Sequence, residues 1–167
     1  DNTRSRGLGD VYKRQVEGKV RLVDAFFTAC PTICPVISSQ LARVHDRLSA
    51  DGLSDRVTLL THTVDPANDT PERMRRYADR LGADPDLWRF LTGPKDELYG
   101  LLQEGYLLTA LASDTAAGGF FHSDQILIVD AEGHIRGTYD GTKTSDVDRM
   151  LEDVYGLLAR TDARNTP

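Results

Sequence analysis

The sequence predicts an α/β fold in which helices flank both faces of a central mixed β-sheet. Three observations lead to this class. Short apolar runs alternate with longer segments of helical periodicity, which is typical of parallel strands joined by crossover helices. The last two apolar runs flank an Asp-Ala-Glu-Gly sequence at 130–133, which predicts an antiparallel hairpin at the sheet edge. The 167 residues suffice for one domain with a substantial core.

The first half of the chain predicts two strands, each followed by a helix. Apolar runs rich in β-branched and aromatic residues predict strands over 20–27 and 57–64. Between them, apolar residues at helical spacing predict an amphipathic helix over about 35–50. The Thr-Pro-Glu sequence at 70–72 predicts the start of the next helix. It combines a capping hydroxyl, a proline suited to the first helical position and a carboxylate near the positive end of the helix.

The second half predicts shorter elements and a closing hairpin. The Gly/Ala/Ser/Asp-rich stretch before the hairpin favours an exposed loop. The predicted elements are a strand over 87–91, a helix over about 95–104, a long loop over 105–121, strands over 125–129 and 135–139, and a helix over about 146–159.

Composition excludes several classes of protein. The chain carries 20 Lys and Arg against 26 Asp and Glu, for a net charge of −6, which argues against a nucleic-acid partner. An apolar content of 40% supports a folded core rather than disorder. No apolar run approaches the roughly 18–20 residues of a membrane span. Two cysteines are too few for a disulfide-rich scaffold but enough for one site.

Both cysteines, Cys30 and Cys34, fall between the first predicted strand and the first predicted helix. If the segment is already coiled, residues four apart lie on one side, so the two sulfurs could share a metal ion or form a disulfide. The positive end of the helix would lower the pKa of a thiol there. The alternative is that two small cysteines only fill the core. A mixed sheet with paired cysteines at this turn predicts a thioredoxin-like architecture.

One histidine is a candidate to join the cysteines in a copper site, because thiolates suit copper(I) and added imidazole suits copper(II). His122 follows the predicted loop and directly precedes a strand, so it could reach over the sheet end that carries the cysteines. The other three histidines have different predicted surroundings: His45 and His134 at the surface, and His62 hydrogen-bonded within the core.

Acidic residues follow the second predicted strand. Asp65 ends that strand at the same sheet edge as the cysteines, so it could orient His122 or tune copper from outside the ligand set. It could equally be a turn residue that binds the following backbone amides. For Asp69 and Thr70, we expect a role in capping the next helix.

Three segments resemble the Sco/SenC family of copper-binding thioredoxin-like proteins: FFTACPTICPVISSQL, HTVDPANDTPE and FFHSDQILIVDAEGHIRGTYDGT. The resemblance spans roughly residues 17–159. It implies that Cys30, Cys34 and His122 are copper ligands, with Asp65 an acidic residue near the site. It further implies a periplasmic or otherwise extracytoplasmic, membrane-anchored protein that helps assemble the dinuclear copper centre of cytochrome c oxidase.

The sequence and the resemblance together give the expected partners and domain boundaries. We expect a copper-site subunit of the oxidase as acceptor and a thiol reductant protein as a second partner, since thiols in an oxidising space tend to form disulfides. Residues 16–160 form the predicted copper-binding domain. Residues 1–15 are predicted to be a non-native or disordered tail and residues 161–167 a flexible tail. We expect the membrane anchor of the full-length protein to lie outside this sequence.

Other interpretations of the cysteine pair remain open. A thiol-disulfide oxidoreductase is the main alternative to a metallochaperone, although thioredoxins have two residues between their cysteines rather than three, and place a cis-proline opposite them. No proline lies between Pro94 and Pro167. A zinc site would need a fourth ligand. A non-catalytic interaction module would leave the paired cysteines unexplained.

Overall fold

A computed structural model describes residues 16–106 and 124–166, together with the backbone of two short strands at 110–112 and 120–122. Five strands form the main sheet in the order β3-β2-β1-β6-β7, and β4 and β5 form a separate two-stranded sheet. The strands are β1 (Val20–Phe26), β2 (Val57–Thr63), β3 (Trp88–Leu91), β4 (Ala110–Ala112), β5 (Phe120–His122), β6 (Gln125–Val129) and β7 (Ile135–Asp140).

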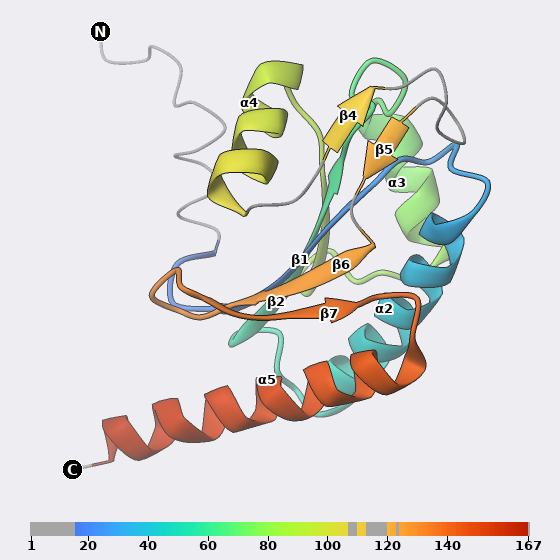
Figure 1. Cartoon of the computed structure of the whole chain (residues 1–167). Coiled ribbons are helices and arrows are strands. Elements are labelled where there is room, and N and C mark those ends of the chain that lie inside the picture. Colours follow the sequence, from blue (N-terminus) through green and yellow to red (C-terminus); the bar gives the residue numbers. More distant parts are fainter. Residues whose placement is uncertain (1–15, 107–109, 113–119, 123, 167) are drawn as a thin grey trace, which may run out of the picture.

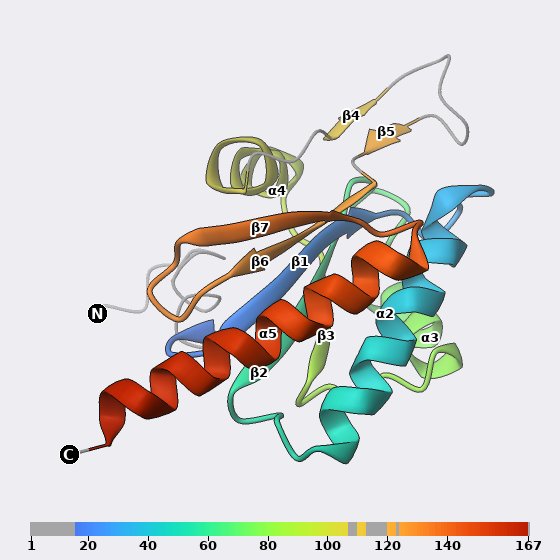
Figure 2. The ribbon, with the colours of Figure 1, turned by 60° about the horizontal axis from the view of Figure 1, so that its bottom comes forward.

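The main sheet is mixed, as predicted. β1 pairs with β2, and β2 with β3, in parallel, whereas β6 runs antiparallel to both β1 and β7. The helices are α2 (Ile33–Ala50), α3 (Pro71–Arg80), α4 (Lys95–Gly100), a π-helical turn η1 (Leu101–Gly105) and α5 (Thr144–Asn165). Helices α2 and α5 cover one face of the sheet and α4 lies on the other, with α3 beside α2 (Figures 1 and 2). The expected α/β class is therefore confirmed.

The period of two along β1 divides the core between these faces. Val20 and Leu22 pack with the apolar residues of α2 and α5. Val23 and Ala25 point the other way and pack with Leu102 of η1, among other residues of that layer. Because β1 lies at the centre of the sheet with apolar contacts on both sides, its carboxyl end is a rigid place from which to start a functional turn.

The helix boundaries differ from the sequence prediction at both ends of the chain. α2 begins at Ile33, two residues earlier than the predicted start at position 35, so Cys34 is already helical. α5 runs to Asn165, so 161–165, predicted as part of a flexible tail, are helical. Residues 1–15, predicted to be a tail, lie outside the described residues. No helix in the described part of the chain has both the length and the apolar character needed to cross a bilayer.

The largest correction concerns the loop predicted over 105–121. Three-residue strands β4 and β5 lie at its two ends and pair antiparallel, with Ala110 opposite His122. Strands this short show no alternation of their own, so their pairing leaves no pattern in the sequence. The β4–β5 ribbon projects from the end of the main sheet at which β1 leads into α2 (Figures 1 and 2).

Candidate functional site

The candidate site begins at the tight turn that joins β1 to α2. The backbone N–H of Cys30 donates a 3.1 Å hydrogen bond to the carbonyl of Phe27, which turns the chain sharply. Cys30 precedes the helix, whereas Cys34 lies in its first turn. The sulfur of Cys30 is 3.7 Å from the hydroxyl oxygen of Thr32. Neither residue forms a disulfide, and the two thiols are 7% and 1% exposed. The predicted strand-to-helix position of the pair is confirmed.

The thiol of Cys34 is strongly disfavoured as a thiolate. Burial raises its pKa most, and hydrogen bonding with Cys30 and the nearby charge of Asp24 raise it further, against a smaller lowering through the backbone of Phe27. The expectation that the helix end would lower the pKa is therefore wrong for Cys34, because desolvation outweighs the helix dipole. A positive ion or a sulfur–sulfur bond at this position would remove the cost of a buried negative charge.

A polar network that the sequence analysis missed lies beneath Cys34. Asp24, 4% exposed on β1, accepts a 2.6 Å hydrogen bond from the hydroxyl of Thr61. Thr61 in turn accepts a 2.9 Å bond from the indole N–H of Trp88. The network therefore links β1, β2 and β3 in one line across the sheet. A lone carboxylate inside the apolar run VRLVDAFF was the feature that could have identified it, since buried charges need partners.

Asp69 connects the cysteine turn to the rest of the fold. Its carboxylate is fully buried and accepts hydrogen bonds from the backbone N–H of Thr28 at 3.1 Å and from the hydroxyl of Thr63 at 2.6 Å. The hydroxyl of Thr28 donates to it as well, and the guanidinium of Arg73 lies 3.8 Å away. The expectation that Asp69 caps α3 is corrected: the side chain of Thr70 alone makes the cap, accepting from the N–H of Arg73.

Asp65 is a turn residue with an unexpected bonding pattern. Its carboxylate accepts from the side-chain amide of Asn68 at 2.9 and 3.1 Å, and its carbonyl accepts from the backbone N–H groups of Asn68 and Asp69. Its own N–H donates to the hydroxyl of Thr63. The Asp65 turn follows β2 and the cysteine turn follows β1, and these strands are paired in parallel. The N–H of Val64 donates to the carbonyl of Phe26, which holds the starts of the two turns side by side. An influence of Asp65 on a metal ligand stays a prediction.

The structure describes the backbone of His122 but not its side chain. The residue ends β5, in the ribbon at the cysteine end of the sheet. Among the side chains that the structure describes, no three His, Cys, Asp or Glu residues form a group able to hold a metal ion. The set of Cys30, Cys34 and His122 therefore stays a prediction.

The remaining histidines have assigned environments. His62 is buried, with Nδ1 3.4 Å from the carbonyl of Asp24, and burial lowers its pKa to about 4, which confirms the core role. His134 is exposed, as predicted. The surface placement of His45 is wrong, because its Nε2 accepts from the N–H of Asp84 at 3.0 Å and the residue is 4% exposed.

Together these features define a thioredoxin-like protein whose paired thiols lie at the turn from the central strand into a helix. The chain belongs to the SCO1/SenC family, whose model matches residues 7–159. Among sequence relatives, it is 25% identical to the SCO1 protein homolog of Bacillus subtilis, over 87% of this chain and 74% of that protein. It is 30% identical to a protein of Stutzerimonas stutzeri named for copper binding, over 73% of this chain and 58% of the relative.

Solved structures of the family are similar over most of the chain. A SCO1/SenC family lipoprotein from Bacillus anthracis superposes with a TM-score of 0.78 at 22% identity, covering 87% of this chain and 85% of that one. BsSco, a member of the Sco family of cytochrome c oxidase assembly proteins with a disulfide switch, gives 0.71 at 25%, covering 85% and 81%. Yeast Sco1 with copper bound gives 0.68 at 25%, covering 93% and 86%.

Proposed function

We propose that this protein binds one copper ion through Cys30, Cys34 and His122 and passes it to the dinuclear copper centre of cytochrome c oxidase during assembly. The observation that carries the proposal is the pair of buried thiols, not joined in a disulfide, in one turn at the end of the central strand. The family supplies the metal: yeast Sco1 has been solved with copper bound, and the Stutzerimonas relative is named for copper binding.

The donor set fits copper better than the other common metals. Two thiolates are soft ligands that suit copper(I), and an imidazole nitrogen adds a ligand that suits copper(II). Three protein ligands leave room for an incoming ligand from an acceptor, so transfer can proceed by ligand exchange. Binding must displace the thiol protons, and the raised pKa of Cys34 makes that step sensitive to acid.

A thiol-disulfide oxidoreductase is the second candidate, favoured by the unequal exposure of the two thiols. Cys30, the more accessible, would attack a partner disulfide as a thiolate and form a mixed disulfide, releasing one partner thiolate. Cys34 would then attack Cys30, so that the partner leaves as a dithiol and this chain keeps the two-electron-oxidised disulfide. BsSco carries a disulfide switch, which supports redox cycling in the family. A reducing protein partner would restore the dithiol.

The proposed setting is the extracytoplasmic face of a membrane. The Bacillus anthracis relative is a lipoprotein, and BsSco belongs to a family that assembles cytochrome c oxidase. We infer a similar anchored location here, with the copper-site subunit of the oxidase as the acceptor.

Copper titration of the reduced protein tests the proposal. We expect one copper per chain, with affinity lost in Cys30→Ala and Cys34→Ala and weakened in His122→Ala. His134→Ala removes an exposed histidine elsewhere and should bind as the wild type does. If the wild type binds no copper while its cysteines still exchange with a small dithiol, metal delivery is wrong and the oxidoreductase takes its place.

A further inference from the structure

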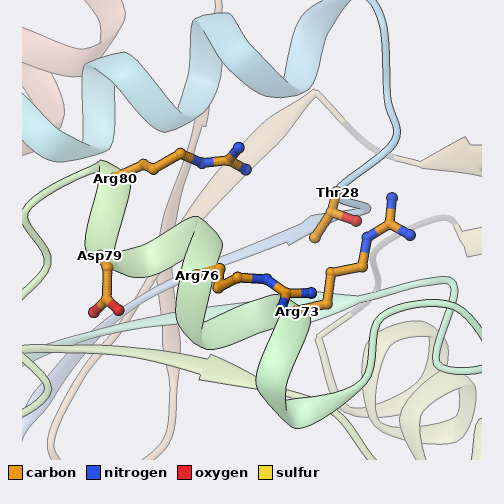
Figure 3. Close-up of a pocket in the computed structure, with 5 residues that line it drawn as sticks. All are labelled: Thr28, Arg73, Arg76, Asp79 and Arg80. Carbon is orange, nitrogen blue, oxygen red and sulfur yellow. The ribbon is translucent and has the colours of Figure 1, made fainter.

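A pocket rich in arginine lies beside the cysteine turn. It has a volume of about 470 Å³ and is lined by Thr28, Arg73, Arg76, Asp79 and Arg80. In Figure 3, the three arginine side chains extend from one side of α3 toward Thr28 and α2, while Asp79 points away from them. Thr28 lies two residues before Cys30 in the chain, so the pocket adjoins the turn that carries the thiols.

The charge of this pocket is opposite to that of the whole protein. The chain has a net charge of −6, yet three arginines line the pocket against one aspartate. Only part of this positive charge is neutralised within the described part of the chain. Arg73 lies 3.8 Å from Asp69, and Arg76 pairs with Glu72 at 3.2 Å. Arg80 forms no ion pair among the described residues and lies over the ring of Tyr77, 5.6 Å from its centroid.

The pocket and the cysteine turn are mechanically linked. Asp69 binds both Thr28 in the turn and Arg73 in the pocket. On the other side, Tyr77 lies beneath Arg80 and its hydroxyl hydrogen-bonds the hydroxyl of Ser38 on α2 at 3.0 Å. The arginines are therefore held on the structure that positions the thiols, rather than on an independent surface loop.

We propose that this pocket docks an acidic segment of the protein that exchanges copper or thiols with Cys30 and Cys34. The inference rests on the proposed function, which requires such a partner. Guanidinium groups bind carboxylates through paired hydrogen bonds, and opposite charges accelerate and orient the encounter of two proteins. A partner held by its carboxylates at this pocket would present its neighbouring residues to the cysteine turn.

The spacing of the arginines favours an extended segment over a single small anion. Arg73 and Arg80 are seven positions apart on α3, which corresponds to about 10 Å along a helix axis. A single carboxylate would have to draw both side chains together across that separation. Alternate side chains of an extended peptide lie about 7 Å apart on one face, so two or three acidic residues can meet the arginines in sequence.

The first test measures binding of a fluorescein-labelled hexaglutamate peptide by anisotropy at low ionic strength, with a hexaglutamine peptide as the neutral probe. We expect the wild type to bind hexaglutamate but not hexaglutamine. The triple variant Arg73→Gln, Arg76→Gln and Arg80→Gln should bind it about tenfold or more weakly. The double variant Arg76→Gln and Arg80→Gln keeps Arg73 and its contact to Asp69. It should also bind hexaglutamate more weakly than the wild type, which separates docking from any loss of structure at the turn.

The matched control removes the same charge from another helix. Arg149→Gln, Arg160→Gln and Arg164→Gln all lie on α5 and change the net charge equally. This variant should keep most of the affinity for hexaglutamate. An equal loss in both triple variants would mean that only overall charge matters, and would overturn the docking site. Competition by free glutamate or citrate as strong as that by hexaglutamate would assign the pocket to a small anion instead.

The second test links the pocket to exchange at the thiols. The Cys30–Cys34 disulfide, formed by mild oxidation, is opened either by an acidic peptide with one cysteine among glutamates or by the same peptide with glutamines. Each peptide forms a mixed disulfide with one cysteine and releases the other as a thiol. We expect the acidic peptide to react faster with the wild type, and the pocket variants to lose this preference. Reduction by dithiothreitol should be equal in all variants. A preference for the acidic peptide that survives in the pocket variants would refute the proposal.

This design keeps the two proposals distinguishable. The anisotropy measurement involves no copper and no thiol chemistry, so it reports on docking even if copper delivery proves wrong. Conversely, the copper titration involves no acidic probe, so a failure of the arginine pocket leaves the metal proposal standing.

Discussion

The cysteine turn and the β4–β5 ribbon, which carry the proposed copper ligands, are built very differently. The turn leaves the central strand of a five-stranded sheet, and the carboxylate of Asp69 binds it to the end of β2. The ribbon has three residues in each strand and, within the described part of the chain, pairs with no strand of the main sheet. An isolated two-stranded sheet is at best marginally stable, so its position depends on what it contacts.

This difference divides the proposed site into a preformed half and an attached half. Cys30 and Cys34 are held within the core, whereas His122 lies on a strand of only three residues. A site of this kind can keep its thiols in place while one ligand joins or leaves. We expect the two halves to respond differently to mutation and to pH.

Among substitutions in the preformed half, we expect Asp69→Ala to have the largest effect on stability. It removes a buried carboxylate that accepts bonds from Thr28 and Thr63 and leaves those donors without their acceptor. We expect the free energy of unfolding to fall by about 3–5 kcal/mol in urea denaturation. The control Asp79→Ala, which removes an exposed aspartate of α3, should change the free energy of unfolding by less than about 0.5 kcal/mol. Equal effects would show that Asp69 does not hold the turn.

Acid should lower the free energy of unfolding by a smaller amount, through His62 in β2. In the folded chain burial lowers the pKa of His62 from 6.5 to about 4, so between these values the unfolded chain binds more protons and stability falls as pH falls. The loss should reach about 3 kcal/mol at the acid end of this window. Denaturation at several pH values measures it, with His62→Leu expected to flatten the slope between pH 6.5 and 4 and exposed His134→Gln to retain it. A slope unchanged in His62→Leu would contradict the assignment.

The smallest effect on stability should come from the attached half. Ala110 pairs with His122, and Ala110→Pro disturbs the ribbon because proline lacks a backbone N–H and restricts its neighbour. We expect the free energy of unfolding to change by less than about 1 kcal/mol, since the main sheet is untouched. Copper affinity should nevertheless fall toward that of His122→Ala. Large destabilisation would show instead that the ribbon is part of the cooperative core.

Much of the fold could be predicted because patterns of neighbouring residues indicate where each strand and helix begins and ends. The apolar run at 20–27 matches β1, and Thr70 with Pro71 starts α3 where the sequence indicates. The position of both cysteines followed from these neighbours. In each case the residues that form the element also contain the pattern that predicts it.

The parts that could not be predicted depend on contacts between distant segments. Thr28 and Asp69 are separated by 41 positions, so nothing local in either indicates their bond. The burial of His45 likewise comes from a partner at Asp84, 39 positions away. The charged residues that follow His45 in the sequence predicted a solvent-exposed side chain, but the segment before β3 covers it.

The three-way bond at Asp69 also has an evolutionary consequence. Thr28, Thr63 and Asp69 come from three separate segments, yet one carboxylate makes them a single unit. Loss of any one member leaves the others with an unmet bonding requirement, so a first substitution is penalised before a second can compensate. Among descendants of this chain, we expect these positions to change together or not at all, while the exposed surface around them drifts freely.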